Sequence, residues 1–141
     1  FKRVVEIKVM GSFYAAQAVG KRLKQQAQGG SIVLISSIAG KRGIVNTAAY
    51  NAANFAVNGM MQSMARELAP LGINVNSVCP GLIPTTRWEG VDWAARISEV
   101  PAARAGTHEE VGELIAFLCT PAAGYINGQA INIDGAMVTE H

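Results

Sequence analysis

Apolar residues recur along the chain in three blocks of helical spacing, and three short stretches typical of strands lie between and after them. The blocks span about Val4–Ala27, Tyr50–Leu68 and Thr107–Leu118. Within each block the apolar positions are three or four residues apart, which is typical of helices that bury one face. Glycine or proline follows the first two blocks, where helices commonly end.

The three short stretches predict strands. They cover Ile32–Ile35, Ile73–Val78 and Gln129–Ile133. The first is continuously apolar, as expected for a strand covered on both faces in a parallel sheet. The order of elements alternates helix and strand three times, which favours a parallel sheet with helices on both faces. We therefore predict an α/β fold with a doubly wound, Rossmann-like parallel sheet.

The first predicted helix has no strand before it. The chain also starts at Phe1 without an initiator methionine. A doubly wound sheet carries its Gly-rich dinucleotide loop after the first strand, and no such loop occurs here. We therefore expect residues 1–141 to be the C-terminal part of a single Rossmann-fold domain, without the N-terminal dinucleotide-binding half.

The second helix is apolar around most of its circumference. Half of all residues in the chain are hydrophobic and only 16% are charged, which is below the usual quarter or so. A helix of this kind is expected to be buried on nearly all sides, by the sheet on one side and by a partner subunit on another. We predict a homodimer or homotetramer formed through the first two long helices.

Charge and cysteine content narrow the class of protein. The net charge of +2 is small and scattered, which argues against a nucleic-acid or membrane surface. The sequence shows neither a signal peptide nor an apolar run long enough for a membrane span. Cys79 and Cys119 lie far apart without metal-like spacing, so we predict two reduced, buried thiols in a cytoplasmic protein without a metal site.

The third helix carries a clear start signal. Thr107 is followed three residues later by Glu110, the pattern of a capping box in which each side chain bonds the backbone of the other residue. His108 lies in the first turn, and we interpret it as an exposed residue rather than a catalytic one.

Candidate chemistry follows the carboxyl ends of the first two strands, where α/β sheets bind ligands. Ser36 and Ser37 come directly after the first strand, and the segment Pro80–Thr85 follows the second. Tyr50 opens the helix between these strands. Asn54, four residues later, shares its face of that helix.

These residues resemble those of the short-chain dehydrogenase/reductase family. The resemblance rests on five features in order along almost the whole chain: Ile35-Ser36-Ser37, Tyr50 at its spacing from Ser37, Ala65-Arg66-Glu67-Leu68-Ala69, Asn76-x-x-x-Pro80-Gly81, and Gly128-Gln129 followed by Asp134-Gly135. It implies an oxidoreductase that transfers a hydride between NAD or NADP and a ketone or secondary alcohol. Positions 80 to 85 correspond to the segment that contacts the nicotinamide, so Pro80, Gly81, Ile83 and Thr85 become the cofactor-binding candidates.

The family resemblance also implies a role for each hydroxyl. Tyr50 matches the acid/base that exchanges a proton with the substrate oxygen, and Ser37 matches the partner that stabilises that oxygen. A free tyrosine has a pKa of about 10, so a nearby ammonium is needed to favour the phenolate near neutrality.

The source of that ammonium departs from the usual pattern. The family carries Tyr-x-x-x-Lys, whereas the fourth residue after Tyr50 is Asn54. The family asparagine of the preceding helix, three residues before a glycine, is replaced by Lys8 before Gly11. Synthase ketoreductase domains show a similar exchange, which implies that Lys8 reaches Tyr50 from the other helix. The alternative is a surface lysine and a degenerate site, in an inactive homologue or truncated fragment that acts only in binding or oligomer formation.

Other positions leave two interpretations open. Lys41 and Arg42 could meet an anionic substrate group, or they could form a solvated loop. Trp88 and Trp93 could line a lid over an apolar substrate, or they could pack against a partner subunit. The sequence decides neither NAD versus NADP, nor the substrate, nor the direction of reaction.

Overall fold

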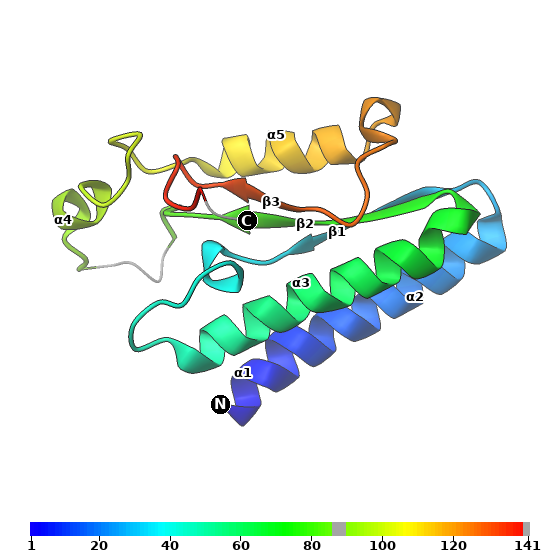
Figure 1. Ribbon diagram of the computed structural model, residues 1–141, viewed down its shortest axis with the longest axis horizontal. Coiled ribbons are helices and arrows are strands. Elements are labelled where there is room, and N and C mark those ends of the chain that lie inside the picture. Colours follow the sequence, from blue (N-terminus) through cyan, green and yellow to red (C-terminus); the bar gives the residue numbers. More distant parts are fainter. Residues whose placement is uncertain (86–89, 140–141) are drawn as a thin grey trace.

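The protein contains a parallel β-sheet with helices on both faces (Figure 1). The computed structural model describes residues 1–85 and 90–139. The strands are β1 (Gly30–Ile35), β2 (Ile73–Pro80) and β3 (Ala130–Ile133), in the order β1-β2-β3. Both neighbouring pairs are parallel. The predicted α/β class, the three strands and their parallel arrangement are confirmed.

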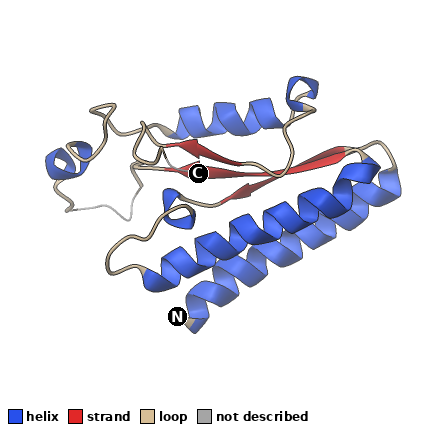
Figure 2. Ribbon diagram, viewed as in Figure 1, coloured by secondary structure: helices blue, strands red, loops and turns tan. Residues whose placement is uncertain are grey.

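Two long helical segments cover one face of the sheet, and one helix covers the other (Figure 2). The first segment is continuous through α1 (Lys2–Val4), η1 (Val5–Met10) and α2 (Gly11–Gln26), and α3 (Ala48–Leu68) lies beside it. The opposite face carries α5 (His108–Leu118). The shorter helical turns are η2 (Ile38–Gly40), η3 (Ala69–Leu71), α4 (Trp93–Ile97) and η5 (Pro121–Ala123).

Each face of the sheet has its own hydrophobic core. Alternate residues of β2 point to opposite faces, so Ile73 and Val75 join the core under α2 and α3, whereas Val78 joins the core under α5. Leu118 anchors α5 in the second core and is 1% exposed. The sequence predicted β1 to be covered on both faces, but Ile35 at its end is 42% exposed. This expectation was wrong for Ile35, because β1 pairs only with β2 within the described residues and lies at the edge of the sheet.

A π-helical turn interrupts the first helical segment. It spans η1 and includes Lys8. π-helical turns are rare and occur frequently at functional sites, because their wider winding redirects side chains. Lys8 is half-buried, like its neighbours Val5 and Val9, on the inner side of the segment.

The buried side of α3 is more polar than its sequence indicated. Val57, Met61 and Ala65 are buried as expected, but so are Asn51, Asn54 and Asn58. Phe55, in contrast, is 48% exposed. The apolar pattern of this helix did not indicate these buried amides, and those of Asn51 and Asn58 bond the backbone of a neighbouring loop.

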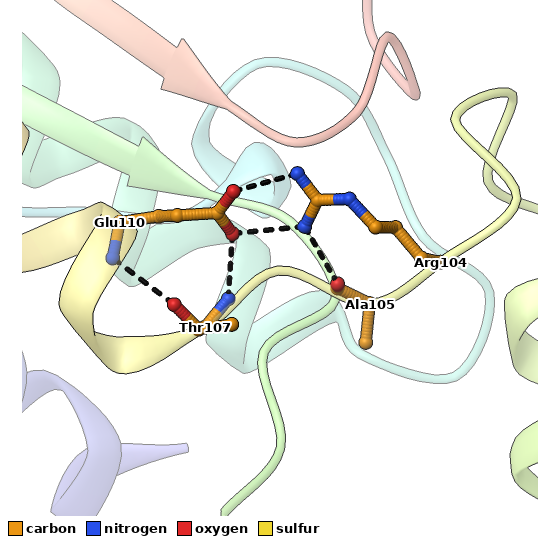
Figure 3. Close-up of polar contacts among 4 residues, drawn as sticks. All are labelled: Arg104, Ala105, Thr107 and Glu110. Atoms are coloured by element: carbon orange, nitrogen blue, oxygen red, sulfur yellow. Dashed lines mark hydrogen bonds and ion pairs between the residues drawn. The ribbon is translucent and has the colours of Figure 1, made fainter.

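An ion pair reinforces the predicted capping box at the start of α5 (Figure 3). Thr107 Oγ1 accepts from the Glu110 amide at 3.1 Å, and the Glu110 carboxylate accepts from the Thr107 amide at 2.9 Å. The Arg104 guanidinium donates to both carboxylate oxygens of Glu110, at 2.6 and 2.9 Å. These hydrogen bonds, chiefly those from Arg104, lower the pKa of Glu110 to about 2. His108 is exposed, as predicted.

The two cysteines differ in their surroundings. Both are free thiols, but only Cys79 is buried. The prediction that Cys119 is buried was wrong, because it follows the last residue of α5 and lies at the helix terminus rather than on the face held by Leu118. Within residues 1–85 and 90–139, no helix is long and apolar enough to cross a membrane.

Candidate active site

The candidate site lies where the carboxyl end of β1 meets the start of α3. Ser37 is the second residue after β1 and caps the short helix η2. Its Oγ accepts a hydrogen bond from the Ala39 amide at 3.1 Å. This bond fixes the side chain and uses an acceptor lone pair, so the hydroxyl hydrogen remains available to a ligand oxygen.

Tyr50 is the third residue of α3 and is 40% exposed. Its backbone carbonyl accepts a hydrogen bond from the side-chain Nδ2 of Asn54 at 2.8 Å. Among the hydrogen bonds of the described residues, none involves the Tyr50 hydroxyl. The phenol is therefore accessible and free to bond a ligand.

Lys8 reaches the same strand end from the other helical segment. Its Nζ donates to the Ile35 carbonyl oxygen at 2.7 Å, and Ile35 is the last residue of β1. Burial lowers the pKa of the Lys8 ammonium, and the nearby Cys79 acts in the opposite direction. The ammonium has two further N–H groups with which it could bond another acceptor.

Asn54 is fully buried beneath the turn that follows β1. Ser36 Oγ donates to the Asn54 backbone carbonyl at 3.1 Å. The Asn54 side-chain oxygen is buried and has no hydrogen-bond partner in the structure, although buried polar atoms are nearly always paired. A buried oxygen without a partner indicates that a donor group binds there, either from a neighbouring side chain or from a ligand.

Lys8 and Ser37 lie at the carboxyl end of β1, and hydrogen bonds link this end to the first turns of α3. The Lys8 ammonium donates to the Ile35 carbonyl, and the hydroxyl of the next residue, Ser36, donates to the Asn54 backbone carbonyl. The Asn54 side chain in turn donates to the Tyr50 backbone carbonyl. The helical segment of Lys8 and the start of α3 lie at the same end of the molecule as the carboxyl ends of the strands (Figure 1). The exchange of residue types implies that the Lys8 ammonium lies close to the Tyr50 hydroxyl. This closeness stays a prediction.

The candidate cofactor segment leaves β2 at the same end of the sheet. Pro80 is the last residue of β2, and the Gly81 amide donates to the Ile133 carbonyl at 3.0 Å. A Cβ on Gly81 would lie 2.6 Å from the Asp134 Cβ, so only glycine lets these two strand ends approach so closely. Thr85 is exposed.

A pocket of about 420 Å³ opens on the α5 side of this segment. Ile83 contributes to its wall together with Glu109 and Glu113 of α5 and Asp134 after β3. Neither Ser37 nor Tyr50 lines it. The cofactor candidate Ile83 therefore lines a pocket to which these two catalytic candidates do not contribute.

Sequence reasoning missed Asn51 and Asn58, which are buried on α3 and bond the loop after Ser37. The available signal was the spacing of seven residues between them, which places them on one helix face with Asn54. Lys41 is half-buried and Arg42 is exposed. Trp93 begins α4 and is partly buried, whereas Trp88 lies outside the described residues.

Comparison with known proteins gives consistent matches over the whole chain. A protein-family model described as enoyl-(acyl carrier protein) reductase matches residues 1–137. A 3-oxoacyl-[acyl-carrier-protein] reductase of Synechocystis sp. is 40% identical over 98% of this chain and 56% of its own length. The chain spans about half the length of the curated relatives that it matches.

Solved structures with bound nicotinamide cofactors share the fold. A 4-hydroxyisoleucine dehydrogenase complexed with NADH superposes with a TM-score of 0.92 at 28% identity, over 100% of this chain and 60% of the other. A dehydrogenase structure from Agrobacterium tumefaciens with bound NADP gives 0.84 at 32% identity, over 91% of this chain and 54% of the other.

Proposed function

Because the chain belongs to the short-chain dehydrogenase/reductase family, we propose that the protein is a nicotinamide-dependent oxidoreductase acting on a ketone or secondary alcohol. The observation that supports this proposal is that Lys8 and Ser37 lie at the carboxyl end of β1, which Ser36 bonds to the first turns of α3, the helix of Tyr50. Two hydroxyls and an ammonium brought together by a bound substrate would meet the needs of a reaction that changes the charge and protonation of one oxygen atom.

Each residue has a defined part in the proposed reaction. A nicotinamide, when bound, supplies or accepts the hydride. The Tyr50 hydroxyl donates a proton to the substrate oxygen during reduction and recovers it during oxidation. The Ser37 hydroxyl donates a hydrogen bond to the same oxygen, which stabilises negative charge there as the carbon–oxygen bond order changes.

Lys8 supports the proton transfer in place of the lysine that the family carries four residues after the tyrosine. An ammonium within about 4–6 Å of the phenol lowers the phenol pKa. The unpaired Asn54 oxygen is an acceptor for the Lys8 ammonium or for a ribose hydroxyl. This atom fits the nicotinamide half of a cofactor, as do the exposed Thr85 and the partly buried Ile83 in the segment after β2. Pro80 and Gly81 fix the start of that segment.

We propose that residues 1–141 form the C-terminal part of one Rossmann-fold domain, completed on the free edge of β1. Support comes from the share of the relatives' length that the chain spans and from the edge position of β1. The choice between NAD and NADP then rests on residues that read the ribose 2′ position in the other half of such a fold.

The deciding experiment measures NADH and NADPH consumption by absorbance, on the full polypeptide that the gene encodes. Ketone substrates should include a 3-oxoacyl thioester, since the Synechocystis relative reduces one by name. Tyr50→Phe should abolish turnover and leave cofactor affinity nearly unchanged, because it removes a proton donor and little volume. Tyr125→Phe, which alters a fully exposed tyrosine, is the matched control. More than a tenth of wild-type activity in Tyr50→Phe would exclude Tyr50 as the acid/base.

We also propose that the outer face of the two long helical segments pairs with a second copy of the protein. Ile7 and Tyr14 on the first segment are 66% and 58% exposed, and Phe55 on α3 is 48% exposed. Such apolar side chains at one helix pair are unusual for a free surface. Light scattering at micromolar concentration should show a dimer or tetramer. Tyr14→Lys should dissociate it and Tyr125→Lys should not, whereas a monomeric wild type would contradict the proposal.

A cytoplasmic location is part of the same proposal. Both cysteines are free thiols, which fits a reducing compartment. Cell fractionation with an antibody to the native protein would place it, and recovery in a secreted fraction would contradict this location.

A further inference from the structure

Asn51, directly after Tyr50, bonds the loop that follows Ser37 with its whole amide group. Its Nδ2 donates to the Ala39 carbonyl at 2.9 Å and to the Arg42 carbonyl at 2.6 Å. Its Oδ1 accepts from the Ile44 amide at 3.4 Å and from the Thr47 hydroxyl at 2.5 Å. A side-chain amide has two donor hydrogens and two acceptor lone pairs, so every hydrogen-bonding position of Asn51 is used.

The bonds of Asn51 lead directly to Ser37. The Ala39 carbonyl accepts from Asn51, and the amide of the same residue donates to Ser37 Oγ. The rotamer of the Ser37 hydroxyl therefore depends on where Asn51 holds Ala39. Since Asn51 is adjacent to Tyr50 in α3, it ties one hydroxyl to the helix that carries the other.

A second asparagine holds the same turn deeper in the structure. Asn58 Nδ2 donates to the Gly40 carbonyl at 2.9 Å, and Asn58 Oδ1 accepts from Ser77 Oγ at 2.8 Å. A Cβ on Gly40 would lie 2.9 Å from the Asn54 carbonyl group, so the turn is in close contact with α3. Asn58 anchors the turn to α3 and β2, but unlike Asn51 it has no bond to Ala39 itself.

Packing alone does not require a polar residue at position 51. Asn51 is 8% exposed, and burying an amide is unfavourable unless it is fully hydrogen-bonded. An apolar residue would fill the space but would leave the Ala39 and Arg42 carbonyls without this donor. The Asn51 side chain fixes three backbone groups between Ser37 and Tyr50. They are the Ala39 carbonyl, the Arg42 carbonyl and the Ile44 amide.

We propose that Asn51 is a positioning residue, whose amide sets the placement of the Ser37 hydroxyl relative to Tyr50. This inference rests on the proposed oxidoreductase function. A positioning role predicts a lower kcat with an unchanged KM for the cofactor, because displacing a reactive group slows the chemical step without removing a binding contact.

The test is a double-mutant cycle on kcat with Asn51→Ala and Ser37→Ala in the full polypeptide. Asn51→Ala alone should lower kcat between about ten- and a hundredfold. In the Ser37→Ala background it should lower kcat by less than about twofold, because the group that it positions is already gone. A merely structural role would lower kcat equally in both backgrounds.

A matched control comes from Asn76, which is 1% exposed and holds a loop at the other end of the sheet. Its Nδ2 donates to the Ile126 carbonyl at 2.8 Å, and its Oδ1 accepts from the Gln129 amide at 2.9 Å. Asn76→Ala should lower the melting temperature as Asn51→Ala does but leave kcat of the folded enzyme unchanged in both backgrounds.

Two further measurements cover the case in which Asn51→Ala does not fold. Thr47→Val removes one partner of the Asn51 amide at a partly exposed position, and it should lower kcat less than Asn51→Ala, again only when Ser37 is present. Hydrogen exchange should be faster in residues 39–47 of either variant. Unchanged exchange there overturns the inference without reference to activity.

The outcomes separate this inference from the proposed function. Equal losses from Asn51→Ala with and without Ser37 overturn the positioning role while the function stands. A Ser37→Ala variant with wild-type kcat overturns the positioning role and the proposed part of Ser37, whereas a wild-type protein that consumes neither NADH nor NADPH overturns the proposed function.

Discussion

Two segments at the carboxyl edge of the sheet are anchored to helices by different chemistry. On the α3 side, the buried neutral amide of Asn51 and that of Asn58 hold the turn after Ser37. On the α5 side, the exposed ion pair of Arg104 and Glu110 holds the loop before Thr107 (Figure 3). The first anchor uses hydrogen bonds shielded from water, and the second uses charges in contact with it.

This difference follows from what each segment must do. A hydroxyl that stabilises a reacting oxygen has to stay in one place at any pH in the working range, and uncharged buried amides do not titrate there. The start of α5 only has to remain helical, and a surface ion pair with a capping box achieves this while responding to pH and salt. The contrast predicts losses of activity on the α3 side and losses of stability on the α5 side.

The largest expected effect is the loss of Ser37. Ser37→Ala should raise the activation barrier by roughly 2.7–4 kcal/mol, the range for removal of one oxyanion donor. Steady-state kinetics with saturating cofactor measures it. A change below tenfold in kcat would mean that the hydroxyl serves only its bond to the Ala39 amide, as an ordinary serine at a strand end does.

The second largest effect on the reaction rate is expected from removal of the Lys8 ammonium. Lys8→Ala should raise the apparent pKa that controls the oxidation reaction and slow it at neutral pH, with partial recovery at high pH where the phenolate forms unaided. Each pKa unit corresponds to about 1.36 kcal/mol. The pH dependence of kcat measures this shift, and an unchanged profile would mean that Lys8 is a surface lysine with no part in the proton transfer.

The exchange of residue types can be tested by reversing it. Lys8→Asn combined with Asn54→Lys should recover more activity than either single change, because each single variant leaves the pocket with no ammonium or with two. Initial rates of the four proteins, all at the same pH, are sufficient. A double variant no better than the worse single one would contradict the exchange.

A smaller effect is expected on the α5 side. Thr107→Ala removes the capping hydroxyl and should lower the free energy of unfolding by about 1 kcal/mol, with kcat of the folded enzyme unchanged. Thermal denaturation and kinetics on the same preparation measure both. A fall in kcat comparable to that of Ser37→Ala would contradict the assignment of activity to the α3 side and of stability alone to the α5 side.

The smallest effect is the pH dependence of the ion pair. Pairing with Arg104 lowers the pKa of Glu110 from its ordinary 4.5 to about 2. Since the pKa is lower in the folded protein, the pair stabilises the fold above the ordinary value, and this contribution is lost as the pH falls towards 2. The difference in melting temperature between wild type and Glu110→Gln should therefore be larger near pH 6 than near pH 3. A constant difference would show that the charge of Glu110 is not involved.

Much of the fold and of the candidate site could be predicted because local patterns encode them. The Thr107–Glu110 spacing predicted a capping box that the structure contains, and the apolar run at Ile32 predicted β1. Cys119 was assigned wrongly to the interior, because composition shows that a residue suits burial but not which side of a helix faces the sheet.

By itself, the sequence determined the alternation of helices and strands, the parallel sheet and the residues at its carboxyl edge. These follow from periodicity and from spacings of a few residues, which are local quantities. Only the tertiary structure decided that a π-helical turn aims Lys8 at Ile35, and that Asn51 holds Ala39. Both contacts join residues 12 or more positions apart, and a long-range hydrogen bond depends on how separate elements pack, which no local pattern records.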